Sequence, residues 1–130
     1  MTHLTVPQVL FIHSRVLAET GGSAGIRDFG ALLSAVMRPQ MTFDGQALYP
    51  DLFTRTAALM ESLVSNHPFV DGNKRVGIVA AGLMLRLNGY HLDAGQEELE
   101  RFVLAVAERK KNLSEIAGWL RKKARRSRRR

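Results

Sequence analysis

Cysteine is absent from this 130-residue sequence, and its absence excludes several kinds of site. Disulfide bridges, thiolate zinc ligands and cysteine nucleophiles are impossible without it, and the composition fits a reducing compartment. The first residues lack the basic-then-apolar pattern of a secretory signal. The longest apolar run, residues 76–85, is about half as long as a membrane span. We therefore expect one cytoplasmic domain that does not enter a membrane.

Acidic residues are missing from the last ten positions, which makes the charge distribution uneven. Residues 121–130 carry eight of the nineteen Lys and Arg residues, and the other 120 residues carry eleven basic and twelve acidic side chains. The formal net charge of +7 therefore comes from this C-terminal segment. Because runs of like charge repel, we expect residues 1–120 to form the folded domain and residues 121–130 to be a disordered basic tail. A weak, non-specific contact between this tail and RNA or ribosomes is the functional alternative.

Histidine pairs with the spacing of zinc ligands are absent as well. His3, His13 and His91 show no HExxH-like arrangement, which argues against a metallohydrolase. His13 falls near the apolar stripe of the first expected helix, where a hydrogen-bonded, partly buried imidazole is a simpler interpretation than a metal ligand. The glycine-rich segment 21–28, GGSAGIRD, lacks the lysine and the spacing of a P-loop and is only a weak phosphate signal.

Helical periodicity and capping signals occupy most of the chain. Thr5 and Gln8 have the spacing of a capping box, and the helix starting at Asn73 is apolar on most sides, which predicts a buried, central position. The expected helices begin near Thr5, Asp28, Asp51, Asn73, Gln96 and Asn112. Between residues 39 and 50, Asp44-Gly45 predicts a tight turn between two short arms. The predicted class is all-α: a compact bundle of six or seven helices with one small β-hairpin as a flap.

The stretch His67–Arg75, HPFVDGNKR, leads into that central helix. The first N–H groups of a helix have no internal partners, and the helix dipole adds partial positive charge, so such an end binds phosphate. Gly72 lets the backbone approach a ligand closely, and Asn73 can cap or position. Lys74 and Arg75 add two cations that suit phosphate oxygens. These residues predict an anion-binding cradle.

Three further side chains of the same stretch bring reactivity and anchorage. Asp71 offers an oxygen ligand for magnesium, which often takes one or two carboxylates together with substrate phosphates. His67 can accept a proton from an attacking hydroxyl near neutral pH, and Phe69 would anchor the loop by burying its ring. A base, a metal ligand and an anion cradle are what phosphoryl or nucleotidyl transfer requires. The alternative is a helix-start loop with incidental charges.

HPFVDGNKR resembles the signature of the Fic/Doc superfamily, whose general pattern is His-x-Phe-x-(Asp/Glu)-Gly-Asn-(Gly/Lys)-Arg. The segments GGSAGIRD and RPQMTFDGQALYP and the helix ending in NGY resemble the compact Doc branch, the "death on curing" toxins, so that about 120 residues are covered. The resemblance implies a Fic fold and transfer from ATP to a protein hydroxyl. It implies His67 as general base, Asp71 as the Mg²⁺ ligand and residues 72–75 as phosphate ligands. It also implies that segment 39–50 aligns the target chain.

Two departures from the family pattern bear on the transferred group. AMP-transferring members usually have Gly where this chain has Lys74, and a second Arg where this chain has Ile78. Doc-type toxins share both features, and the resemblance to them implies transfer of the γ-phosphate to a threonine of the elongation factor EF-Tu, which stops translation. The classical Doc motif, however, has Asn-Ala where this chain has Asp71-Gly72. A protein kinase is therefore the first expectation and AMP transfer (a nucleotidyltransferase) the second.

Regulation is also implied by the resemblance. Many Fic proteins carry an inhibitory Ser/Thr-x-x-x-Glu helix, but no Glu here has Ser or Thr four residues before it. The Doc branch implies instead a separate, Phd-like antitoxin of a toxin–antitoxin system whose C-terminal segment covers the active groove. A non-enzymatic alternative, binding of nucleic acid through the basic tail, predicts a steep salt dependence.

Overall fold

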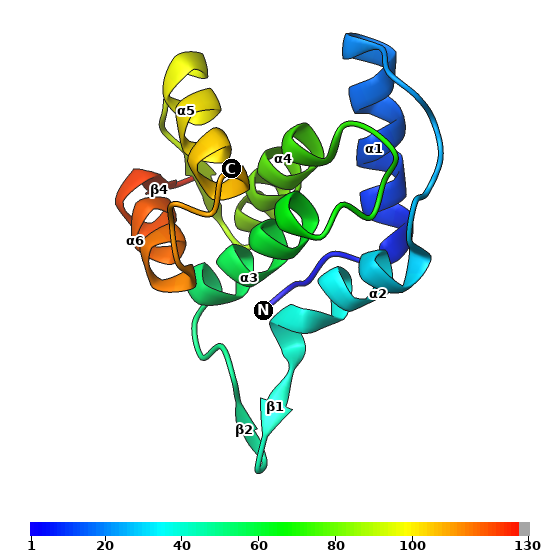
Figure 1. Ribbon diagram of the computed structural model, residues 1–130. Coiled ribbons are helices and arrows are strands. Elements are labelled where there is room, and N and C mark those ends of the chain that lie inside the picture. Colours follow the sequence, from blue (N-terminus) through cyan, green and yellow to red (C-terminus); the bar gives the residue numbers. More distant parts are fainter. Residues whose placement is uncertain (128–130) are drawn as a thin grey trace.

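Two helices, α3 (Leu52–Ser65) and α4 (Asn73–Leu87), form the centre of the computed structural model, which describes residues 1–127 (Figure 1). They pack closely because α4 presents small residues to α3. A Cβ atom added to Gly77 would lie 2.3 Å from a methyl group of Val64. α3 begins at a capping box in which the Asp51 carboxylate accepts the N–H of Thr54. The loop between the two helices, residues 66–72, contains most of the signature stretch.

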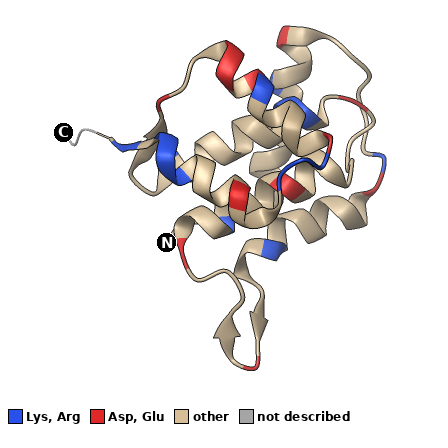
Figure 2. Ribbon diagram, turned by 60° about the vertical axis from the view of Figure 1, so that its left-hand side comes forward, with Lys and Arg blue, Asp and Glu red and all other residues tan. Residues whose placement is uncertain are grey.

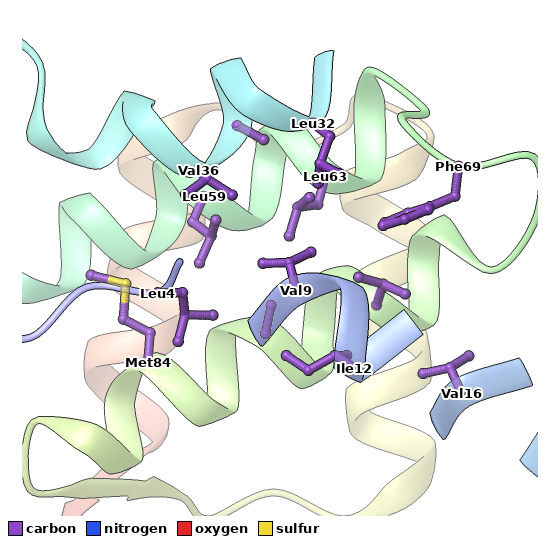
Figure 3. Close-up of a cluster of buried hydrophobic side chains, with 13 residues drawn as sticks. Leu4, Val9, Ile12, Val16, Leu32, Val36, Leu59, Leu63, Phe69 and Met84 are labelled. Atoms are coloured by element: carbon purple, nitrogen blue, oxygen red, sulfur yellow. The ribbon is translucent and has the colours of Figure 1, made fainter. Parts of the chain in front are cut away.

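The N-terminal half of the chain covers one side of this pair. α1 (Val6–Thr20) starts at the predicted Thr5–Gln8 capping box, and α2 (Phe29–Met37) starts at Asp28, whose carboxylate accepts the N–H of Ala31. Both helices contribute side chains to a buried cluster shared with α3 and α4 (Figure 3). Phe69 enters this cluster from the loop and is 1% exposed, so its predicted role as an anchor is confirmed.

The C-terminal half packs on the other side. α5 (Gln96–Ala107) and α6 (Leu113–Lys123) bury a second cluster against α3 and α4. The rings of Phe102 and Trp119 stack at a centroid distance of 3.7 Å and join these two helices. The predicted Asn112–Glu115 capping box opens α6. In Figure 1, α5 and α1 lie on opposite sides of α4.

The predicted hairpin is present at the predicted residues, with its turn at Asp44-Gly45. The 3₁₀ turn Arg38–Gln40 leads into β1 (Thr42–Phe43), which pairs with β2 (Gln46–Ala47). Asp44 and Gly45 both have positive φ, as a type I′ turn requires. The hairpin precedes the N-terminus of α3, whereas loop 66–72 follows the C-terminus of α3. A 14-residue helix is about 21 Å long, so α3 separates the hairpin from loop 66–72 along the chain. The expectation that residues 39–50 align the target chain stays a prediction.

The prediction of a disordered C-terminal tail is wrong for most of that segment. Residues 121–123 form the last turn of α6, and β4 (Ala124–Arg126) pairs with β3 (Tyr90–Leu92), so the expected disordered tail is wrong for residues 121–126. Cations are favourable at the C-terminus of a helix, and carboxylates offset much of the charge. The ion pairs are Arg121–Asp51, Lys123–Glu98 and Arg125–Asp93. Figure 2 shows basic residues, in blue, on the ribbon that leads to the C-terminal end. The remainder of that expectation, residues 128–130, lies outside the described residues.

Six α-helices and two two-stranded antiparallel sheets make up residues 1–127. The prediction of a mainly α-helical bundle with a small hairpin is therefore confirmed, and the β3–β4 sheet is an addition to it. Among the described helices, none is both long enough and apolar enough to cross a bilayer.

Candidate active site

The first turn of α4 presents unpaired backbone donors. Val76 is the first residue of the helix whose N–H has a helical acceptor, the carbonyl of Gly72. Within residues 1–127, no acceptor meets the N–H groups of Asn73, Lys74 and Arg75. Gly72 itself has φ of +84°, a left-handed conformation that favours glycine. The start of α4 is therefore not closed by a capping side chain and can receive an anion.

The loop before α4 is fixed from inside by Asn73 and Phe69. The side-chain oxygen Oδ1 of Asn73 accepts the backbone N–H of Phe69 at 3.0 Å, and the side-chain nitrogen Nδ2 of Asn73 donates to the backbone carbonyl of Phe69 at 2.9 Å. Both ends of the Asn73 side chain are thus committed to the loop. This agrees with the predicted positioning role, and the backbone N–H of Asn73 is available for the predicted phosphate contact.

The loop is fixed from outside by the glycine-rich segment 21–28. Arg27 donates from Nε to the His67 carbonyl at 2.6 Å and from Nη2 to the Asn66 carbonyl at 2.8 Å. The backbone N–H groups of Arg27 and Asp28 both donate to the carbonyl of Pro68. His67 has φ of +49°, which is uncommon for a residue other than glycine. The segment that gave a weak phosphate signal therefore holds loop 66–72 in place.

The carboxylate of Asp71 lies beside the N-terminus of α4. Its Oδ1 accepts the N–H of Gly72 at 3.0 Å, and its Oδ2 accepts the N–H of Ser23 at 3.2 Å. A Cβ atom added to Gly22 would lie 2.8 Å from Oδ2, so only glycine permits this approach. The carboxylate is exposed. Within residues 1–127, no group of three or more His, Cys, Asp or Glu side chains is placed to hold a metal ion.

A cavity of about 1030 Å³ opens between α1, α4 and α5, and the first turn of α4 forms part of its wall. Asp71, Gly72, Asn73, Lys74 and Arg75 line this cavity together. His67 does not line it, and its side chain is exposed on the loop instead. The structure therefore brings five of the six predicted site residues into one cavity and leaves the predicted base on the adjoining surface.

Several residues of this region were not predicted. Glu19 and Thr20, at the end of α1, line the same cavity, and Arg86 lines it further along α4. His13 contacts the backbone of Asp71, and Arg27 contacts that of His67. The sequence held no local signal for these contacts because each joins residues at least 40 positions apart.

Known proteins resemble this chain over most of its length. A model described as the Fic/DOC family matches residues 3–85. Toxin Doc of Mycolicibacterium smegmatis (strain ATCC 700084 / mc(2)155) is 43% identical over 102 residues, which cover 77% of this chain and 78% of that protein. Protein kinase doc of Escherichia phage P1 is 27% identical over 122 residues, which cover 94% of this chain and 95% of that protein.

Proposed function

Because the chain belongs to the Fic/DOC family, we propose that it is a Doc-type toxin that transfers the γ-phosphate of ATP to a protein hydroxyl. The observation that carries this proposal is the start of α4. Unpaired N–H groups, two cations and the Asp71 carboxylate all face one cavity there. A threonine of EF-Tu is the acceptor that we expect, and its modification would inhibit translation in the cytoplasm.

The nucleotide phosphates would lie against the first turn of α4. The N–H groups of residues 73–75 would donate to the phosphate oxygens, and the side chains of Lys74 and Arg75 would neutralise their charge. Asp71 would hold Mg²⁺ together with the nucleotide. When bound, the ion would supply charge neutralisation between the phosphates, and an exposed carboxylate beside the cavity fits this role.

His67 would act on the acceptor. The acceptor oxygen forms a bond to the γ-phosphorus, and the bond between that phosphorus and the β–γ bridging oxygen breaks, so that ADP leaves. The hydroxyl proton passes to the imidazole of His67. His67 is exposed on the loop four residues before Asp71, which suits a proton acceptor that must meet a hydroxyl on another protein.

Transfer of AMP is the second candidate, and the Asp71-Gly72 pair favours it because this half of the motif follows the general Fic pattern. Lys74 and Ile78 favour the kinase, and so does the phage P1 relative, which is named a protein kinase. In AMP transfer the α-phosphorus would be attacked and pyrophosphate would leave.

The groove between α1 and α5 supports a further part of the proposal, a cognate antitoxin. Beyond the first turn of α4, its lining becomes largely apolar, with Ile78, Val79, Leu83, Leu99 and Leu104. A Phd-like antitoxin segment with an apolar face could lie along this lining and cover the phosphate-binding end. The M. smegmatis relative is named a toxin, in keeping with such a pairing.

Intact-mass spectrometry of the acceptor tests the proposal. Purified protein, EF-Tu, ATP and Mg²⁺ are incubated together, and a parallel reaction uses the His67→Asn variant. A phosphate gain that needs His67 is the expected result. An adenylate gain would establish the second candidate instead. If no adduct forms on EF-Tu or on any protein of a cell extract, the proposed transferase is wrong.

A further inference from the structure

His13 is a buried imidazole that the proposed reaction does not use. It lies on α1 among Val9, Ile12 and Val16 and is 7% exposed. Its Nε2 atom is 2.9 Å from the carbonyl oxygen of Asp71. A carbonyl oxygen can only accept a hydrogen bond, so Nε2 carries the proton and donates it. Burying a polar ring in an apolar cluster costs free energy unless it is hydrogen-bonded, which makes this one contact significant.

The contact fixes the direction of a neighbouring donor. The carbonyl of Asp71 and the N–H of Gly72 belong to one planar trans peptide unit, so they point in opposite directions. Because His13 holds the carbonyl towards α1, the N–H of Gly72 must point away from α1. The carboxylate oxygen of Asp71 that meets this N–H at 3.0 Å therefore lies on that side too. One hydrogen bond thus orients both a backbone donor and the carboxylate at the start of α4.

The ring of His13 has a second contact that must be separated from the first. It stacks on Phe69 with a centroid distance of 3.9 Å and an interplanar angle of 8°. Phe69 is already held by the core and by Asn73, so the loop keeps these anchors without the imidazole N–H. Glycine at position 72 adds little resistance to rotation of the peptide, because it tolerates most backbone conformations.

We propose that His13 is a positioning residue, which holds the Asp71–Gly72 peptide so that the Asp71 carboxylate, bound by the Gly72 N–H, faces the bound nucleotide. This role rests on the proposed function, because it assigns the nucleotide to the first turn of α4. It does not make His13 a catalytic residue, since the imidazole reaches the site only through the backbone of Asp71.

Two substitutions separate the hydrogen bond from the packing. His13→Phe keeps an aromatic ring against Phe69 but has no donor. His13→Gln loses the ring, but its amide nitrogen can reach about the position of Nε2. His3→Gln is a matched control, since His3 contacts Arg55 and lies outside the cavity lining. For each full-length variant we would measure the melting temperature, the KM for ATP and kcat in the transfer reaction, and the crystal structure.

The expected pattern is specific to a positioning role. His13→Phe should rotate the Asp71–Gly72 peptide and raise the KM for ATP about tenfold, the effect of one lost hydrogen bond. His13→Gln should keep the peptide orientation and restore most of the affinity, although its melting temperature falls. If KM follows the melting temperature across the variants, His13 serves only stability and the proposal is wrong. If the wild type transfers nothing, the proposed function fails, and the peptide orientation in His13→Phe still decides whether His13 sets it.

Discussion

The guanidinium group of Arg27 donates from Nε to the backbone carbonyl of His67 at 2.6 Å, and its Nη2 reaches the carbonyl of Asn66. These carbonyls follow the last turn of α3, where a cation is also favoured by the helix dipole. Arg27 therefore stabilises the left-handed backbone of the predicted base, His67, whose φ is +49°.

Replacement of Arg27 should affect catalysis more than folding. Arg27→Gln loses at least one charge-assisted hydrogen bond, so we expect kcat to fall about tenfold or more, since each such bond contributes about 1.5–3 kcal/mol. The melting temperature should fall by only a few degrees. Arg15→Gln, at an exposed position on α1, is the control and should leave both values unchanged. Equal activity in the two variants would show that Arg27 does not hold the base.

His67→Asn should abolish transfer and leave the fold intact. Asparagine is among the residues that adopt positive φ most readily, so it suits this backbone better than alanine. Loss of a general base typically lowers the rate about 10²–10⁴-fold. Transfer is measured with labelled ATP and folding by circular dichroism. Activity close to that of the wild type would exclude His67 as the proton acceptor.

The close packing of α3 on α4 predicts opposite effects for two glycines. In Gly77→Ala, the new methyl group would lie 2.3 Å from Val64 Cγ2, so the helices must separate, at a cost of about 1–3 kcal/mol. In Gly118→Ala, on α6, the added carbon would meet no atom within 4 Å other than those of its own turn of helix. This variant should gain up to about 1 kcal/mol from helix propensity. Urea unfolding of both variants gives the comparison, and equal changes in stability would contradict the packing.

Removal of residues 124–130 should destabilise the protein, because β4 pairs with β3 through Ala124–Arg126. Three cross-strand pairs suggest a loss of about 1–2 kcal/mol. Substituting Lys122, Arg125 and Arg126 with Gln removes charge but keeps the strand, and it should cost less. If RNA binding were the function, this substituted protein would lose it while remaining folded. An unchanged melting temperature after truncation would restore the expectation of a separate tail.

Stability should fall in mildly acidic solution through His3. Burial lowers the pKa of the His3 imidazole, and the positive charges of Arg55 and the N-terminal amino group lower it further. The folded state therefore favours the neutral ring. Its contribution to stability is complete above the unfolded pKa of about 6.5 and is lost as the pH falls through the lower folded pKa. Melting curves of the wild type and His3→Gln between neutral and acidic pH should converge as the pH falls; parallel curves would contradict this.

Capping signals explain why most of the fold could be predicted. Thr5, Asp51 and Asn112 each start a helix with a capping box, and these signals lie within four residues of sequence. The turn at Asp44-Gly45 is equally local. Phe69 was recognised as an anchor because a large apolar residue inside a polar loop has to be buried somewhere.

Contacts between distant segments explain what was missed. β3 and β4 are three residues each, and two of the three residues of β4 are arginine. Such a short, charged segment carries none of the apolar alternation by which a strand is recognised in a sequence. Its stability comes from partners such as Asp93 and Tyr90, which only the folded chain brings near. In the same way, the motif identified Asp71 and His67, but not His13 and Arg27, which hold their backbones from 58 and 40 residues away.

The most direct test of the account is a titration of the ¹⁵N-labelled full chain with ATP and Mg²⁺, followed through its backbone amide signals. The account predicts that the largest shifts occur at residues 72–75, the start of α4, and that Lys74→Ala weakens them. Shifts confined to the basic segment 121–127, with none at residues 72–75, would contradict it.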